Sequence, residues 1–356
     1  MKKKPPVKRL VKQPGLKKTA VDPVIPKHLI VVGTSAGGLN ALSELMTQLD
    51  PAMNVTVFVV MHLSHVIVGD YLVHRLQQRT KFTIRLARSD EPILPQSVYI
   101  AGPNSHLLIK DEHTLIGHGP HENRWRPSID ILFRSAAANY GNRVIGIILT
   151  GLLDDGTSGM MAIRECGGKT IVQDPNEAEF PDMPLSVLNH MAVDYVVPLS
   201  GMGQAINEII LNHRPSKKDI PSSVIAESRI AEREAVGIDD VRELGKQSLF
   251  SCPDCGGGLW ELVNQKLHRY RCHIGHAYSQ RDLIQRQGES LEAALWTAIR
   301  MMEERRNMFL KMSRETETKG LRQLANQYHE KSADIARHIE QMKELLFAGQ
   351  KDYKSE

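Results

Sequence analysis

The sequence predicts an α/β protein: a doubly wound, mostly parallel sheet with helices on both faces, followed by a small zinc-ribbon-like module and an α-helical hairpin. Short apolar runs at residues 29–32, 55–61 and 144–149 are typical of parallel strands buried on both faces, and helix-like segments lie between them. Three of the four cysteines cluster after residue 250, which indicates a metal-stabilised module. Two long amphipathic segments after residue 280 predict the hairpin.

The chain divides into five segments. We expect a disordered basic tail over residues 1–27, an α/β domain over 28–213, a linker over 214–247, the zinc-ribbon-like module over 248–280 and the hairpin over 281–348. The tail is rich in lysine and proline and has no acidic residue before Asp22, which predicts a solvated segment rather than a site for nucleic acid. It lacks the apolar core of a secretory signal, and no apolar run approaches the roughly 20 residues of a membrane helix. We therefore expect a cytoplasmic protein without membrane insertion.

The strongest functional signal is the turn that follows the first strand. Residues 33–37 read Gly-Thr-Ser-Ala-Gly and stand between the apolar run 29–32 and a predicted helix over 39–49. A G-x-S-x-G turn between a strand and a helix presents its serine, here Ser35, to a cleft beside the free N–H groups of the helix N-terminus. The alternative is a glycine turn that binds a phosphate or only packs. The full dinucleotide-binding fingerprint is missing, because Ser35 stands at the position of its second glycine.

A nucleophilic serine needs a base and an orienting carboxylate, and two further strand ends supply them. The run 55–61 ends at His62, and the run 144–149 leads into a polar turn that contains Asp155. Because active-site residues of open α/β sheets gather at the carboxyl ends of the strands, we expect these side chains to lie near Ser35. His65 is an alternative base, and His62 with His65 could form a metal pair, but no third ligand is evident nearby.

The order of these residues along the chain points to a particular family. Serine, histidine and aspartate follow each other, whereas α/β-hydrolases have the order serine, acid, histidine, and the two best-known serine protease folds have others again. The chain resembles the catalytic domain of the chemotaxis protein-glutamate methylesterases, the CheB family. The resemblance covers residues 28 to about 200 and rests on stretches that recur in the family's order: residues 31–38, 59–62, 98–103, 126–133 and 148–156.

The resemblance implies a role for each residue of the set. Ser35 would be the nucleophile, His62 the general base and acid, and Asp155 the orienting carboxylate, while the backbone N–H groups of Ala36 and Leu152 would form the oxyanion hole. The implied reaction is the hydrolysis of glutamate methyl esters on a methylated chemoreceptor-like protein, with release of methanol and without a cofactor. Glutamine deamidation could follow the same acyl route. Two alternatives stay open: a signalling adaptor with an inactive esterase fold, and a small-molecule serine esterase.

Two features depart from the family's pattern. Where the family usually has Gly-Met-Gly-Asn-Asp-Gly, residues 151–156 read Gly-Leu-Leu-Asp-Asp-Gly, so Leu153 replaces a glycine and Asp154 an asparagine. We expect the second carboxylate to raise the pKa of one of the two aspartates, and Leu153 to change the shape of the loop. We also expect no receiver domain ahead of the esterase, because the 27 or so residues before the first strand are too few for its core.

The cysteine cluster predicts a structural zinc site. Cys252 and Cys255 are separated by two residues, and Cys272 follows after a spacer of 16 residues, which is the spacing of a zinc ribbon. We expect His276 as the fourth ligand, in preference to the nearby histidines at 268 and 273. The alternative is a disulfide, which a reducing cytosol disfavours.

The last segments of the chain predict two long helices. Ser279 is a candidate N-cap, an apolar stripe runs from there to about Thr316, and a second helix is predicted over residues 321–346 after a break at 317–320. Such stripes usually pack against each other, but methionine-rich seams could also bind a protein partner.

Overall fold

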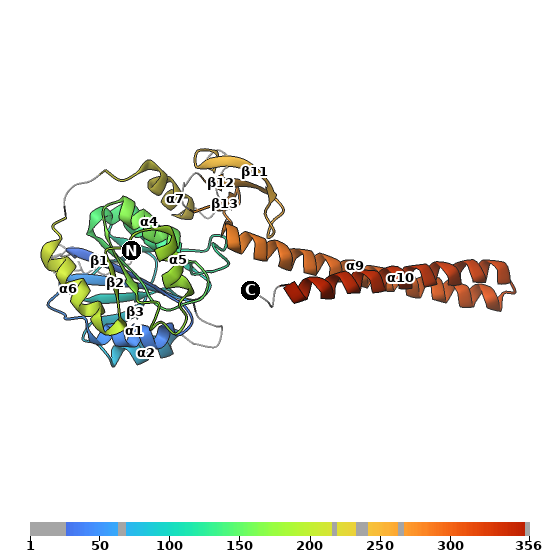
Figure 1. Ribbon diagram of the computed structural model, residues 1–356, viewed down its shortest axis with the longest axis horizontal. Helices are drawn as coiled ribbons and strands as arrows, with labels where there is room; N and C mark the ends of the chain where they lie inside the picture. Colours follow the sequence, from blue (N-terminus) through green and yellow to red (C-terminus); the bar gives the residue numbers. More distant parts are fainter. Residues whose placement is uncertain (1–25, 63–68, 216–218, 233–240, 263–266, 353–356) are drawn as a thin grey trace, which may run out of the picture.

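The computed structural model describes residues 26–62, 69–215, 219–232, 241–262 and 267–352. Figure 1 shows the sheet and its helices on one side, with the ribbon beside them and a long helical hairpin projecting away. The predicted tail, apart from its last two residues, and the alternative base His65 lie outside the described residues.

The main sheet has seven parallel strands in the order β10-β9-β8-β1-β2-β5-β3. Strands β1 and β2 are buried along their whole length, which explains why their sequences are mostly apolar. The chain winds to one side of β1 through β2 and to the other side through β8, so the carboxyl ends of these strands meet at a topological switch point. The strands are β1 (His28–Thr34), β2 (Val55–Met61), β3 (Thr83–Leu86), β5 (Ser97–Ile100), β8 (Val144–Ile148), β9 (Lys169–Gln173) and β10 (Tyr195–Val197).

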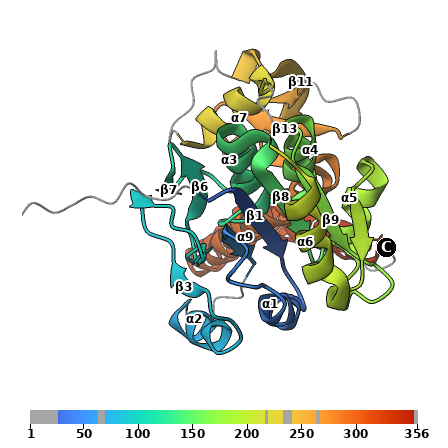
Figure 2. The ribbon, with the colours of Figure 1, turned by 90° about the vertical axis from the view of Figure 1, so that its left-hand side faces the viewer.

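Helices cover both faces of this sheet, as predicted (Figure 2). Alternate residues of β1 enter two separate cores: Leu29 and Val31 pack with one set of helices, and Ile30 and Val32 pack with the other. The first set is α3 (Ile129–Tyr140), α4 (Thr157–Glu165) and α5 (Asp182–His190); the second is α1 (Gly38–Thr47), α2 (Gly69–Gln77) and α6 (Met202–Asn212).

Two parts of the α/β domain were not predicted. An antiparallel sheet in the order β4-β7-β6 contributes β6 to the surface against which α3 packs. Helix α7 (Ser222–Glu232) lies within the segment for which the sequence predicts a linker, and it too packs on α3. Its buried residues include Glu227, and a buried charge does not register in a hydrophobic pattern. The strands are β4 (Glu91–Pro92), β6 (His106–Lys110) and β7 (His113–Gly117).

The ribbon module is a four-stranded antiparallel sheet in the order β11-β12-β13-β14. Two buried arginines of β13 attach it to the α/β domain. Arg269 pairs with Glu227 of α7 at 2.6 Å, and Arg271 pairs with Glu122 at 2.9 Å. Buried charges are tolerated where they are paired and hydrogen bonded, so these pairs define how the module sits. The strands are β11 (Gly245–Ser251), β12 (Gly258–Leu262), β13 (Arg269–Cys272) and β14 (Ala277–Ser279).

The hairpin consists of α9 (Gln280–Thr318) and α10 (Arg322–Asp352), close to the predicted helices. Ser279 caps α9 as expected, since its hydroxyl accepts the N–H of Asp282 at 3.1 Å. Gly320, with φ 76°, lies in the break between the helices, where glycine takes a positive φ without strain.

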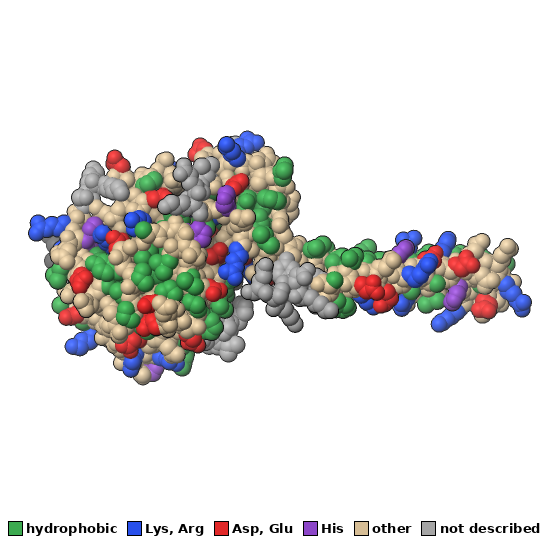
Figure 3. Space-filling view, in the orientation of Figure 1, with side chains coloured by type: hydrophobic (Ala, Val, Ile, Leu, Met, Phe, Trp, Pro, Cys, Tyr) green, Lys and Arg blue, Asp and Glu red, His purple; other side chains and the backbone are tan. Residues whose placement is uncertain are grey.

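The two helices pack against each other along the predicted stripes. Near the α/β domain the rings of Trp296 and Phe347 meet edge to face with centroids 6.4 Å apart. On the face seen in Figure 3, apolar side chains gather on the half of the hairpin next to the domain, and charged side chains dominate the outer half. Within the described residues, no helix combines the length and apolar character that crossing a bilayer requires.

We predict that Gly33→Ala destabilises the domain, because a Cβ at this position would lie 2.4 Å from Cγ2 of Ile129, at the start of α3. A buried methyl group that forces neighbours apart costs roughly 1–3 kcal/mol, and urea unfolding measures this loss in the free energy of unfolding. Gly119→Ala is the matched control, since a Cβ there has no neighbour within 4 Å among the described residues. Equal unfolding midpoints for the two variants would contradict the close approach of α3 to β1.

Candidate active site and metal centre

Ser35 and His62 are neighbours across strands β1 and β2. The ladder between these strands pairs Thr34 with Met61, so Ser35 and His62 are the residues that follow its last pair. The backbone N–H of His62 donates to the carbonyl of Thr34 at 3.1 Å, and the N–H of Ser35 donates to the carbonyl of Thr150 at 3.1 Å. The three strand ends selected from the sequence therefore lie together.

The imidazole of His62 is oriented by Asp155. Nε2 of His62 lies 3.0 Å from Oδ2 of Asp155, and both side chains are 1% exposed. Because a carboxylate accepts hydrogen bonds, Nε2 carries the proton and Nδ1 carries the lone pair that a general base needs. Nδ1 is buried and has no hydrogen-bond partner among the described residues, so no protein group there uses its lone pair.

Asp155 receives four further hydrogen bonds around the N-terminus of α3. Its Oδ1 accepts the hydroxyl of Ser128 at 3.0 Å and the backbone N–H of Asp130 at 3.2 Å. Its Oδ2 accepts the backbone N–H of Ile129 at 2.7 Å. The side-chain amide of Asn123 donates to Oδ1 at 3.2 Å. The N-terminal end of a helix dipole suits a negatively charged side chain, and these donors hold the carboxylate in one orientation.

A second contact on the imidazole comes from Trp125, which was not selected from the sequence. Its ring stacks on that of His62 with centroids 4.0 Å apart and 8° between the planes. Trp125 and Asn123 belong to one turn, residues 122–125, which is closed by backbone hydrogen bonds of 3.0 and 3.2 Å between Glu122 and Trp125. The turn directly precedes the family-like stretch 126–133, and that is the one sequence signal that could have drawn attention to it.

The two predicted oxyanion-hole amides face no competitor within the protein. In the described part of the chain, the N–H groups of Ala36 and Leu152 donate to no protein acceptor, so both are available to a ligand. Gly151 allows Ser35 to come close to this loop, because a Cβ at position 151 would lie 2.9 Å from Cβ of Ser35. The hydroxyl of Thr150 donates to the carbonyl of Ala36 at 3.1 Å and ties the two loops together.

Leu153 and Asp154, the two loop residues that differ from the family's usual sequence, have different consequences. Leu153 has φ 67°, so a non-glycine residue here adopts the left-handed conformation that glycine adopts readily. Asp154 forms a side-chain hydrogen bond with Ser279, the N-cap of α9. Burial, with help from the charge of Asp155, raises the pKa of Asp154, in the direction expected for neighbouring carboxylates.

Two buried groups support the N-terminus of α3 from behind. Asp130 accepts the N–H of Gly159 at 2.7 Å, and burial together with the charge of Asp155 raises the pKa of Asp130 to about 7. Nδ1 of His106 accepts the N–H of Ser128 at 3.2 Å. Burial lowers the pKa of His106 to about 4, so His106 is a neutral acceptor at this position.

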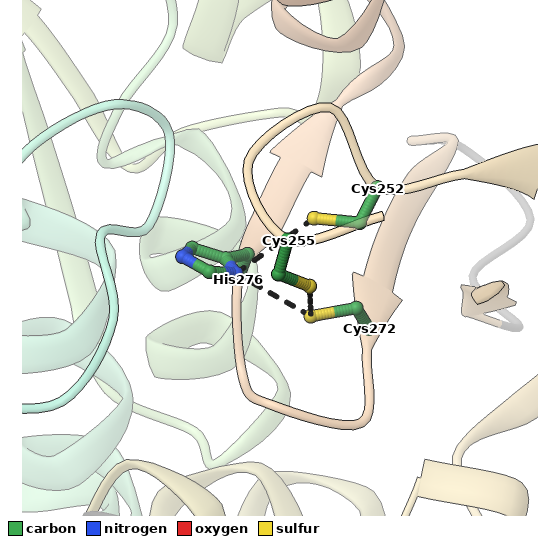
Figure 4. A group of neighbouring side chains, drawn as sticks. All are labelled: Cys252, Cys255, Cys272 and His276. Atoms are coloured by element: carbon green, nitrogen blue, oxygen red, sulfur yellow. Dashed lines mark hydrogen bonds between the residues drawn. The ribbon is translucent and has the colours of Figure 1, made fainter. Parts of the chain in front are cut away.

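The four predicted metal ligands come together in the ribbon. The three thiol sulfurs and a ring nitrogen of His276 all lie within 4.8 Å of one another (Figure 4). Sγ of Cys255 is 3.7 Å from Sγ of Cys272, and Nδ1 of His276 is 3.5 Å from Cys272 and 3.7 Å from Cys252. All three cysteines are free thiols, so the alternative of a disulfide is not what the ribbon contains.

The nearby histidines and polar groups take other positions. His268 is exposed and pairs with Glu261 at 2.8 Å, away from the cluster. Around the cluster, the hydroxyl of Tyr278 lies 3.0 Å from Sγ of Cys252 and donates to Asp254 at 2.6 Å. Outer partners of this kind orient first ligands in metal sites.

Comparisons with known proteins agree on one family. A sequence model of a family described as CheB methylesterase matches residues 30–206. A curated relative from Leptospira interrogans, named putative protein-glutamate methylesterase/protein-glutamine glutaminase, is 38% identical over 176 residues, which cover 49% of this chain and 91% of that protein. The protein-glutamate methylesterase/protein-glutamine glutaminase 2 of Xanthomonas campestris pv. campestris is 32% identical over 184 residues, 51% of this chain and 52% of that protein. This chain thus spans about half the length of the Xanthomonas relative.

A crystal structure of the Thermotoga maritima CheB methylesterase catalytic domain aligns with a TM-score of 0.49 at 28% identity, over 51% of this chain and 98% of that chain. The residues matched by the family model contain β1, β2 and β8 together with Ser35, His62 and Asp155, and they end before the ribbon begins. The chain belongs to the CheB methylesterase family.

Proposed function

We propose that this protein is a protein-glutamate methylesterase that hydrolyses glutamate methyl esters on a chemoreceptor-type protein through Ser35, His62 and Asp155. The observation that carries the proposal is the buried 3.0 Å contact between His62 and Asp155. His62 follows the end of β2, which pairs with the strand β1 that precedes Ser35. Family membership and the names of the relatives support the same substrate class. Those names also include glutaminase activity, so the amide of glutamine is the second substrate of the proposal.

In the first half of the reaction, Nδ1 of His62 removes the hydroxyl proton of Ser35 while Oγ attacks the ester carbonyl carbon. The carbonyl oxygen becomes an oxyanion and receives the free N–H groups of Ala36 and Leu152. The bond between carbon and the methoxy oxygen then breaks, and methanol leaves with the proton from Nδ1. Asp155 stabilises the imidazolium that exists between these two proton transfers.

In the second half, water repeats the sequence on the acyl-enzyme. Nδ1 of His62 takes a proton from the water, the hydroxide attacks the carbonyl carbon, and the bond to Oγ of Ser35 breaks as the proton returns to the serine. The product is the free glutamate side chain. With a glutamine substrate the first leaving group is ammonia and every other step is the same.

We further propose that the four-residue cluster of the ribbon holds a structural zinc ion. Zinc–sulfur bonds of about 2.3 Å in a tetrahedron place two thiolate sulfurs about 3.8 Å apart. The 3.7 Å separation between Cys255 and Cys272 fits that value, and the donor set of three cysteines and one histidine is a common one for zinc. Four protein ligands leave no open coordination position, so the ion's part is to stabilise the module and not to bind substrate.

We predict that Ser35→Ala reduces methanol release from a methylated receptor by about 10⁴-fold or more, because the acyl-enzyme cannot form. Ser43→Ala, in α1, is the control and should keep full activity, since among the described residues the Ser43 hydroxyl bonds within its own helix, to the carbonyl of Leu39. Equal release by the wild type and by Ser35→Ala would contradict the proposed function. Rapid turnover of a simple aryl ester without any activity on receptors would favour the small-molecule esterase instead.

We predict about one zinc ion per chain in the purified protein, measured by elemental analysis. Cys255→Ser should lose most of this zinc and lower the unfolding midpoint, because the exposed Cys255 is a ligand and has no packing role. Cys166→Ala, which changes the cysteine outside the cluster, should keep its zinc. Folded wild-type protein without stoichiometric zinc would rule out the metal site.

A further inference from the structure

We propose that the C-terminal module is a positioning part of the catalytic centre: β13, β14 and α9 hold the turn of residues 122–125, and this turn holds His62 and Asp155. We name residues 122–125 the positioning turn. The inference rests on the proposed function, because it concerns the same two side chains. It assigns a role to the ribbon and hairpin, which lie outside the residues matched by the family model.

The inner side of the positioning turn contacts both groups of the catalytic pair. The amide of Asn123 donates to Oδ1 of Asp155 at 3.2 Å and to Oδ2 of Asp130 at 2.9 Å. Trp125 covers one face of the imidazole of His62 at 4.0 Å. One side chain thus fixes the carboxylate and the other prevents the imidazole from tilting out of the plane that it shares with its acceptor.

The outer side of the turn is bound by the C-terminal module at three points. Arg271 of β13 donates to Glu122 at 2.9 Å, and the carbonyl of Ala277 in β14 accepts the backbone N–H of Asn123 at 2.9 Å. Arg124 pairs with two acids of α9, at 2.6 Å with Glu289 and at 3.6 Å with Asp282. Every residue of the turn therefore contacts either the module, the catalytic pair, or both.

The backbone of the turn needs this support. Asn123 and Arg124 have φ of 48° and 70°, and a turn with positive φ at both central residues is one that glycine normally occupies. Without glycine, the conformation persists where surrounding contacts determine it. The contacts of the turn with the ribbon and α9 supply that determination from outside the α/β domain.

The anchor of the turn is a buried cluster of charges. Glu122, Arg134 and Arg271 are each 2% exposed, and Arg134 pairs with the other oxygen of Glu122. Burial alone would raise the pKa of Glu122, but the two guanidinium groups outweigh it and lower the pKa to about 2. If Arg271 loses its charge, Glu122 keeps one of its two partners, and the edge of the turn that faces the ribbon loses its strongest contact.

The test uses the full chain with three glutamine variants: Arg271→Gln, Arg124→Gln and the control Arg300→Gln. Arg300 also forms an ion pair on α9, but its partner is Glu304 of the same helix, at 2.6 Å, and not the turn. Two rates are measured: kcat and KM for methanol release, and the rate at which a fluorophosphonate labels Ser35 with loss of fluoride. Zinc content is measured for each variant, because Arg271 adjoins the ligand Cys272.

We expect Arg271→Gln to lower kcat and the labelling rate by about 10- to 100-fold, and Arg124→Gln to lower both by about 5-fold or more, with KM unchanged. Misplacing His62 and Asp155 slows the chemical step and therefore lowers kcat. Among the described residues, the turn does not contact Ser35. Arg300→Gln should stay within about 3-fold of the wild type, because its ion pair is exposed and lies away from the turn. All three variants should keep their zinc.

A second pair of variants tests the inner side of the turn. Trp125→Leu should lower the labelling rate by about 10-fold and shift its pH profile, because the imidazole loses its stacking partner. Trp125→Phe keeps an aromatic face over His62 and should restore most of the rate and the wild-type profile. Equal losses in the two variants would contradict a positioning role for the stack.

The outcomes separate the two proposals. Full activity in both Arg271→Gln and Arg124→Gln, or an equal loss in Arg300→Gln, overturns the positioning role of the module. If Arg271→Gln does not fold, Arg124→Gln decides, because the Arg124 side chain is 25% exposed and tolerates replacement. A wild-type protein that neither labels nor releases methanol contradicts the proposed function. In that case the positioning role is tested by the ring-current shift that Trp125 imposes on the carbon-bound protons of His62. Loss of this shift in Arg124→Gln supports the positioning role, and an unchanged shift overturns it.

Discussion

The hydrogen bond between His62 and Asp155 determines which nitrogen of the imidazole carries the lone pair, and the proposed reaction depends on it. Nε2 faces the carboxylate at 3.0 Å, so the lone pair lies on Nδ1, on the side of the ring that has no protein partner among the described residues. Asp155 can perform this task because four other donors already hold it at the N-terminus of α3. The start of α3 therefore holds Asp155, and through it the imidazole of His62, in one orientation.

The same pair connects the sheet to the C-terminal module. His62 comes from the end of β2, Asp155 from the loop after β8, and the turn that touches both is bound by the ribbon and α9. The connection runs through buried charges, where removing one partner typically costs about 3–5 kcal/mol because the other charge is left in a dry environment. Buried charge pairs resist separation of the module from the domain, which suits a positioning part. The hairpin projects away from the α/β domain and the ribbon (Figure 1).

Much of the fold was predictable because its signals are local. The runs that became β1, β2 and β8 are mostly apolar; Ser35 and His62 directly follow the first two, and Asp155 lies in the loop after the third. The cysteine spacing likewise predicted the four residues that meet in the ribbon. Helix boundaries in the hairpin agreed closely with the pattern, since Ser279 caps one helix and Gly320 lies in the break.

The parts that were missed depend on partners distant in the sequence. Asn123 and Trp125 stand in a polar turn, and nothing local reveals that one will reach Asp155 and the other will cover His62. Helix α7 lies in the segment predicted to be a linker, and one of its buried residues, Glu227, is charged and pairs with Arg269 of the ribbon, far along the sequence. Leu153 takes the left-handed conformation, with φ 67°, although it is not a glycine.

The most direct test of the central interaction is the protonation of the two ring nitrogens of His62, read from their nitrogen-15 chemical shifts in the full chain near neutral pH. We predict a proton on Nε2 that is coupled to a strongly shifted hydrogen-bond resonance, a bare Nδ1, and loss of that resonance in Asp155→Ala. A proton on Nδ1, or a resonance unaffected by the loss of Asp155, would contradict the assignment of His62 as the base for Ser35.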